Sequence, residues 1–558
     1  MTADNLSRVE MTTGSPEEAP HRGQRVDQFT SEVTSTGLLL LLGNAVSTII
    51  LALVTIVVAR VLGPDSYGVY SLILLTPTYL AFAIDLGLPT SLAHFSAKAH
   101  ANSEEDKAGH FASTAITTGV VLGLLSTIAA VLFSSFISNV VISRPGTETL
   151  VAWASVILAP QVAFNLLSQF FPSVRRPGYS AAINVIQGLV KALVQLSLVL
   201  FSYSVAGAVI GNVAGSVVAS LVGIALLVVK VKPKRLISID FDLLKKMLLY
   251  GLPFYLCIFL YQTQIQYEGI LMGGLSTDAQ IGNYKIASNF MFILSMTVAP
   301  LNSTFVPAFS RYDPKKDREV LESIFREAIK YASFVTLPLA AAVITLSGDG
   351  VYALFGNEYA EAPLYLALLA LHSIFSPIGA NVIANSFNGL GKSHYVLAIN
   401  GSWAFFFMLL ARPVMLWAGL PGMIVLFTAS WIPAVVVGLV MAKLKFGMGI
   451  DLSWSIRIYL ATMIAALSTW ALVNYFPLGK GWPNLVLGGP VFVALILTLY
   501  PLLRVLDSRD LDRLDGFLSG SGPFRPALGA FVRLERRLVS ASPFERPSDK
   551  HATPETLG

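Results

Sequence analysis

Apolar runs of about twenty residues recur along nearly the whole chain, and this feature limits its fold more than any other. A helix needs about 20 mostly apolar residues to cross the hydrocarbon core of a bilayer. Hydrophobic residues make up 54% of the 558 residues and charged residues only 13%. Such a chain cannot cover its apolar surface with polar groups, so lipid must cover it. The sequence therefore predicts an all-α integral membrane protein.

The apolar runs also predict where the chain crosses the bilayer, in about fourteen spans. The predicted spans are 37–59, 68–88, 114–137, 150–171, 180–201, 205–229, 251–273, 283–306, 330–347, 362–388, 394–417, 421–442, 455–476 and 484–506. Charged and small polar residues fill both ends of the chain. We expect a disordered tail over 1–34 and a second polar tail over 507–558.

Lysine and arginine gather in every second connection between the predicted spans. Odd-numbered connections carry little more than Arg60, Arg144 and Lys480, whereas even-numbered ones carry most of the remaining basic residues. Cytoplasmic connections hold such an excess, so we expect the even-numbered connections and both termini to be cytoplasmic, in a multi-pass protein of the cell membrane. The same bias explains the net charge of +5 without a nucleic-acid partner.

A weak internal repeat relates two parts of the chain. Gly68 recurs 214 residues later as Gly282, and Asn165 recurs 216 residues later as Asn381. Each repeat unit holds an even number of predicted spans, so the two copies have the same orientation and their symmetry axis lies along the membrane normal. We expect an N-terminal lobe, a C-terminal lobe and two added spans, over 35–230, 231–445 and 446–506.

Four polar residues share one face of the fifth predicted span. Asn184, Gln187, Lys191 and Gln195 are spaced by three, four and four residues, which aligns them on a helix. An ionisable residue at the centre of a spanning helix costs at least about 2.5 kcal/mol. We therefore expect Lys191 to face a water-filled cavity or an acidic partner. Amide groups can instead join helices within a lobe, and this alternative stays open for Asn and Gln.

Further candidates for the wall of a cavity lie on other spans. Gln262, Gln266 and Glu268 make the seventh span polar, while Arg412 and Arg60 lie near span ends. A role in the cavity and a role at the membrane interface are both open for Glu268 and Arg412. Lysine and arginine bind phosphate, and amides bind hydroxyl groups. Such a cavity suits a substrate with anionic and sugar-like parts.

The sequence carries no motif of an enzyme. It has no P-loop and no external loop with paired carboxylates, and its odd-numbered connections are too short for a catalytic domain. Its single cysteine, Cys257, excludes an intrachain disulfide and a cysteine-rich metal site. We expect a protein that is not an enzyme and that uses no cofactor or metal.

Short motifs in a fixed order identify a family resemblance that covers roughly residues 35–445. They are ARVLGPDSYGVYSL from Ala59, DLGLPTSL from Asp85, LLKKMLLYGLPFYL from Leu243, IGNYKIA from Ile281, FVPAFSR from Phe305, LFGNEY from Leu354 and NGLGK from Asn388. Together they resemble Wzx-type polysaccharide flippases. These belong to a superfamily that also contains MATE multidrug exporters and MurJ-type lipid II flippases.

The resemblance implies a flippase that carries a polyprenyl-phosphate- or diphosphate-linked oligosaccharide from the cytoplasmic to the outer leaflet by alternating access, for surface polysaccharide synthesis. Lys191 and Arg412 would contact the diphosphate, and Glu268 would pair with a cation or carry a coupling proton. The sugar path would be lined by Asn184, Gln187, Gln262 and Gln266. Membrane lipids, a glycan polymerase and glycosyltransferases are the expected partners. A cation-coupled multidrug exporter is the alternative, although the first and fifth spans lack the acidic residue common in MATE exporters.

Overall fold

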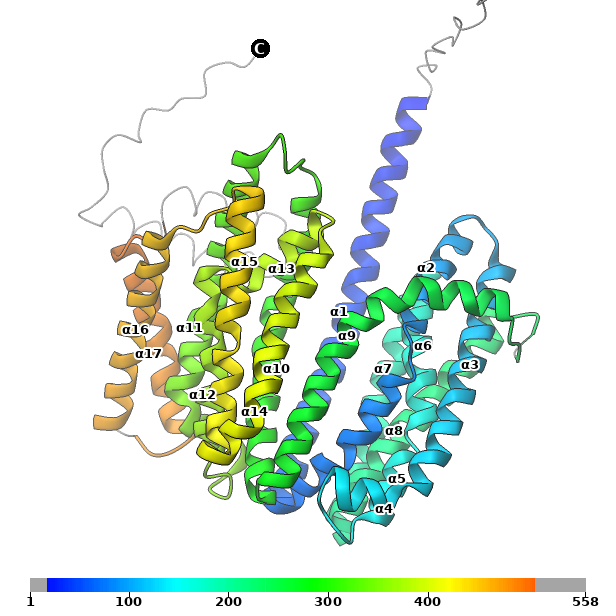
Figure 1. Ribbon diagram of the computed structural model, residues 1–558, viewed down its shortest axis with the longest axis horizontal. Coiled ribbons are helices and arrows are strands. Elements are labelled where there is room, and N and C mark those ends of the chain that lie inside the picture. Colours follow the sequence, from blue (N-terminus) through cyan, green and yellow to red (C-terminus); the bar gives the residue numbers. More distant parts are fainter. Residues whose placement is uncertain (1–17, 236, 477, 507–558) are drawn as a thin grey trace, which may run out of the picture.

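The computed structural model describes residues 18–235, 237–476 and 478–506, and all regular elements among them are helices (Figure 1). The first part of the chain forms α1 (Glu18–Ala83), α2 (Leu88–Ala101), α3 (Glu105–Leu132), α4 (Ser134–Phe136), η1 (Ile137–Val141), α5 (Glu148–Ser155), α6 (Leu158–Ser173), α7 (Pro177–Leu198), η2 (Val199–Tyr203), α8 (Ser204–Leu226) and η3 (Leu227–Val231). This confirms the predicted all-α fold class.

The second part of the chain forms the remaining helices. They are α9 (Phe241–Leu275), α10 (Asp278–Ser310), α11 (Arg318–Phe355), α12 (Ala362–Ala370), η4 (Leu371–Ile378), α13 (Ala380–Gly389), α14 (Ser393–Ala429), α15 (Trp431–Phe446), α16 (Leu452–Tyr475) and α17 (Trp482–Leu502). The predicted C-terminal tail, 507–558, lies outside the described residues, as do residues 1–17. The helix α1 begins at Glu18, inside the stretch 1–34 that we expected to be a disordered tail.

The helices gather into two bundles. Figure 1 shows α2–α8 on one side and α10–α17 on the other, with α1 and α9 running between them. The main contacts between the bundles join α1 to α10 and α1–α3 to α9. The helix α9 bends by 67° between its halves Phe241–Pro253 and Ile258–Leu275, because a proline inside a helix removes a backbone hydrogen bond. We call the two groups the N-bundle (α1–α8) and the C-bundle (α9–α17).

Two glycines break long helices at expected turns. The backbone is non-helical at Gly63 within α1 and at Gly419 within α14. Their φ angles of +71° and +63° lie in the region that glycine adopts without strain. The break at Gly63 lies between the predicted spans 37–59 and 68–88, and α1 contains the first of them and most of the second.

Nine helical stretches among the described residues are long and apolar enough to cross a membrane, or up to eleven if each of two bent pairs forms one span. The stretch Ser393–Phe446 counts once although it has 54 residues, which at about 1.5 Å per residue is longer than one crossing. Each predicted span overlaps an observed helix, and the predicted count stays a prediction. Large apolar side chains such as Phe201 and Trp417, 76% and 88% exposed, suit contact with lipid. The chain is a multi-pass membrane protein.

Candidate functional site

A cavity of about 550 Å³ lies between the two bundles. The N-bundle contributes side chains from α1, α6, α7 and α8 to its wall, and the C-bundle contributes side chains from α9 and α10. Such a position between two helical units is where transporters of repeated architecture bind their substrates. Four of the candidate residues from the sequence line this cavity: Gln187, Lys191, Gln262 and Gln266.

Two lysines from opposite bundles line the cavity. Lys191 comes from α7 and Lys285 from α10, and their ammonium groups repel each other. The sequence argument did not single out Lys285, although it lies within the predicted span 283–306. It is the third residue of that span, where a lysine side chain can reach the membrane interface, so its charge alone did not mark it as a site residue. Two positive charges facing one space create a site for an anion.

Amide groups form the wall on the N-bundle side. Gln187 Nε2 donates to Gln161 Oε1 at 3.3 Å and to Ser216 Oγ at 3.2 Å, and Gln161 Nε2 donates to Asn165 Oδ1 at 3.0 Å. These contacts join α6, α7 and α8. The sequence left two roles open for such amides, joining helices or lining a cavity, and Gln187 does both.

Side chains from α1 connect the cavity wall to both bundles. The hydroxyl of Tyr70 accepts a hydrogen bond from Gln195 Nε2 at 3.1 Å, within the N-bundle. The hydroxyl of Tyr67 accepts from Asn289 Nδ2 at 3.2 Å, which crosses to α10. All four side chains line the cavity. Their polar groups offer partners for hydroxyl groups of a ligand.

The seventh predicted span also reaches the cavity. Gln262 and Gln266 lie on its wall, and Gln266 Nε2 donates to Thr76 Oγ1 at 3.3 Å. Glu268 is buried behind the wall, where its carboxylate accepts a hydrogen bond from the Tyr284 hydroxyl. It also attracts the neighbouring Lys285. The arrangement places an acid next to a cation, and the predicted pairing or coupling role of Glu268 stays a prediction.

Besides Glu268, three further candidates do not line the cavity. The side chain of Asn184 lies beside Ser168, whose hydroxyl is 3.4 Å from Asn184 Oδ1. Arg412 is exposed on the surface of α14. Arg60 donates from Nη2 to the carbonyl oxygen of Ala353 at 2.7 Å and from Nε to that of Leu354, at the end of α11. Arg60 therefore joins the two bundles and does not face the cavity.

One end of the cavity is closed by contacts between the bundles. We call the end that holds 60–67, 138–149, 274–282 and 348–361 the outer end, because the charge pattern predicts that it faces away from the cytoplasm. There the Tyr359 hydroxyl donates to the carbonyl oxygen of Ala59 at 2.7 Å. Among the described residues, no group of three or more His, Cys, Asp or Glu side chains is placed to hold a metal ion.

Comparisons with known proteins give a family and a fold. A family model described as "Polysaccharide biosynthesis protein" matches residues 57–363. The chain is 23% identical over 133 residues to "Probable low-salt glycan biosynthesis flippase Agl15" of Haloferax volcanii. That match covers 23% of this chain and 28% of the relative, so the chain spans less than a third of the curated relative's length.

Two solved structures are similar over most of the chain. "Lipid II flippase MurJ, inward closed conformation" has a TM-score of 0.68 at 15% identity, covering 83% of this chain and 99% of that one. An inward-facing multidrug resistance MATE family transporter of the MOP superfamily has a TM-score of 0.62 at 17% identity, covering 73% and 98%. At these identities the likeness establishes a shared fold.

Proposed function

Since the chain belongs to the polysaccharide biosynthesis protein family, we propose that it is a flippase that moves a polyprenyl-linked oligosaccharide from the cytoplasmic to the outer leaflet. The pair Lys191 and Lys285 carries this proposal, because it sets two cations from opposite bundles around one cavity. Charge-assisted hydrogen bonds from lysine to phosphate are stronger than those between neutral groups. The phosphate or diphosphate of the lipid would lie between the two ammonium groups and relieve their repulsion.

The amide-rich wall supports a sugar as the neighbouring group. Gln187, Gln262 and Gln266 offer donors and acceptors along the cavity, and sugar hydroxyl groups need both. The apolar polyprenyl tail would stay in the lipid, where the exposed apolar side chains of the helices already lie. The head group is then the part of the substrate that needs a polar path.

Transport would follow from rocking of the two bundles around the cavity. The contacts at the outer end hold that side shut, and the opposite motion would release the head group to the outer leaflet. This mechanism makes and breaks no covalent bond, so the protein is a transporter and not an enzyme. We propose cytoplasmic termini in the cell membrane, with a glycan polymerase or glycosyltransferases acting on the same substrate.

A cation-coupled exporter of small molecules is the second candidate. The buried Glu268 next to the cavity favours it, because a carboxylate in a dry site can exchange a proton or another cation. The two lysines oppose it, since they would repel cationic drugs. Expression in a drug-sensitive host separates the candidates, because an exporter raises the tolerated concentration of several unrelated cations and a glycan flippase does not.

Depletion of the protein in its native cell tests the first proposal. An impermeant glycosidase is applied to the intact cells first, and the lipid-linked glycans are then extracted, so that cleavage identifies the leaflet that each occupied. We expect one lipid-linked glycan to accumulate in the cytoplasmic leaflet while surface glycan is lost. An unchanged distribution of every lipid-linked glycan, in cells that lack the protein, would refute the proposal.

A further inference from the structure

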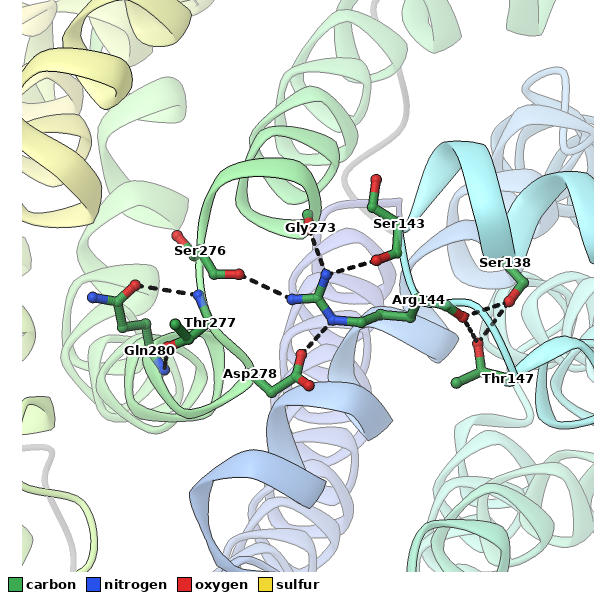
Figure 2. A network of polar contacts seen from close by, with 9 residues as sticks. All are labelled: Ser138, Ser143, Arg144, Thr147, Gly273, Ser276, Thr277, Asp278 and Gln280. Carbon is green, nitrogen blue, oxygen red and sulfur yellow. Dashed lines mark hydrogen bonds and ion pairs between the residues drawn. The ribbon is translucent and has the colours of Figure 1, made fainter.

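Arg144 joins the two bundles at the outer end, in the connection between η1 and α5. Figure 2 shows its guanidinium group reaching across to the C-bundle. Nε donates to the Asp278 carboxylate, Nη1 to the carbonyl oxygen of Gly273 at 2.7 Å, and Nη2 to that of Ser276 at 2.9 Å. One side chain from the N-bundle thus satisfies three acceptors at the junction of α9 and α10.

Both sides of this contact are held in place by local structure. The carbonyl oxygen of Arg144 accepts hydrogen bonds from Ser138 Oγ at 2.6 Å and Thr147 Oγ1 at 2.8 Å. On the other side, Thr277 and Gln280 form a capping box that fixes the start of α10, where Asp278 lies. The two ends of the contact are therefore already ordered when they meet, which lowers the entropy cost of the pairing.

The environment makes the contact costly to break. The Arg144 and Asp278 side chains are 18% and 30% exposed, so water replaces the lost partners only in part. A charged group left without its partner in such a place costs more than an exposed one. The contact consequently favours the closed arrangement of the outer end.

One face of α10 connects this contact to the cavity. Asp278, Gly282, Lys285 and Asn289 are spaced by four, three and four residues, so they lie on one side of the helix. Asp278 binds Arg144 at the outer end, whereas Lys285 and Asn289 line the cavity. A ligand that binds Lys285 therefore acts on the same helix that carries Asp278, the partner of Arg144.

We propose that Arg144 is a positioning residue, the latch that keeps the outer end shut, and that the head-group site controls it through α10. The latch consists of Arg144 with Asp278, Gly273 and Ser276. The control by the head group rests on the proposed function, whereas the latch itself does not. The outer end opens only when the Arg144 guanidinium leaves its three acceptors.

Distance measurement across the outer end tests the latch without any substrate. In the full chain with Cys257→Ser, spin labels at the exposed positions Thr149 and Asn474 report the separation of the bundles in lipid vesicles. We expect Arg144→Gln to raise the population with a long distance at least tenfold, because the loss of hydrogen bonds from a charged group shifts an equilibrium by about this factor. Asp278→Asn should raise that population less, since it removes only one of the three acceptors. Lys480→Gln, a neutralised cation at the same end, is the control and leaves the distribution unchanged.

A reversible cross-link keeps the test informative if Arg144→Gln folds poorly. A Cβ atom on Gly274 would lie 3.9 Å from Ser143 Oγ, with no other atom within 4 Å, so cysteines at these two positions would lie near each other across the outer end. Oxidised Ser143→Cys/Gly274→Cys protein is expected to show only the short distance, and a reductant restores the wild-type distribution. Identical distributions in Arg144→Gln, Asp278→Asn and wild type would overturn the latch. A failed glycan assay with a shifted distance would instead count against the proposed function.

Discussion

Gly68 and Gly282, which the internal repeat relates, bring α1 and α10 together backbone to backbone. A methyl group on Gly68 would lie 2.0 Å from the carbonyl oxygen of Asp278, and one on Gly282 would lie 2.0 Å from that of Pro64. Pro64 and Asp278 are also 214 residues apart. The contact is therefore symmetric, with each repeat presenting the same glycine to the same position of the other. Only glycine permits this approach.

We expect Gly282→Ala to separate the bundles at the outer end. Its methyl group cannot occupy a position 2.0 Å from a backbone oxygen, so the helices must move apart. The spin-label distance between Thr149 and Asn474 measures this, and the long-distance population should rise. Gly348→Ala on α11 is the control, since its methyl group meets nothing within 4 Å. Equal distributions in both variants would contradict this account of the glycines.

We expect Lys191→Gln and Lys285→Gln each to reduce surface glycan at least tenfold in cells that lack the wild-type protein. Each removes a charge-assisted contact to phosphate, which contributes about 1.5–3 kcal/mol. Arg412→Gln is the matched control, because Arg412 is exposed on α14. If Arg412→Gln lost activity while both lysine variants retained it, the site would lie elsewhere.

The Gln161 network should contribute to stability. Gln161→Leu leaves Gln187 and Asn165 without a shared partner and Ser216 without its acceptor at 2.8 Å. A buried polar group that loses its partner costs about 1–3 kcal/mol. The temperature of unfolding in detergent should fall, and it should fall less for Gln262→Leu, which lies outside this network. Equal losses would show that the network has no special role.

Asp240 is expected to make the start of α9 sensitive to acid. Its carboxylate accepts from the N–H groups of Leu243 and Asp242 and lies 3.2 Å from His110 Nε2. The Leu243 hydrogen bond, and then His110, hold the pKa of Asp240 below its usual range. Its contribution is therefore complete at neutral pH and is lost as the pH falls through the lowered pKa. The protection factors of the Asp242 and Leu243 amides, which are corrected for the slower intrinsic exchange in acid, should decrease as the pH falls, and Asp240→Asn should remove that pH dependence.

The sequence predicted the candidate site in part, and the limit is physical. Helical spacing identifies the face that carries Gln187 and Lys191, but it does not show how far a cavity extends along that face. Asn184 shares their stripe and lies beyond the lining. Lys285 was missed because it lies near a predicted span start, where a lysine can reach the interface. The charge of Arg60 gave no sign that its partners would be carbonyl groups of a distant helix.

The fold was predicted more fully, because a helix that crosses the membrane needs a long apolar run that is visible in the sequence. The connection between the first two spans and the all-α class follow directly from such runs. The contact of Gly68 with Gly282 did not follow, since a repeat shows which residues are equivalent and not which of them meet. Similarly, Arg144 could be assigned to an odd-numbered connection, but its partner Asp278 is distant in sequence and needs the folded chain.

The most direct test of the central claim is a flipping assay with purified protein. Vesicles carry on one leaflet the lipid-linked glycan that accumulates on depletion, and an impermeant glycosidase measures how much remains accessible. We predict that the wild-type protein makes half of the glycan inaccessible, and that Lys191→Gln/Lys285→Gln slows this at least tenfold. Movement at the same slow rate in vesicles with and without the wild-type protein would contradict the account.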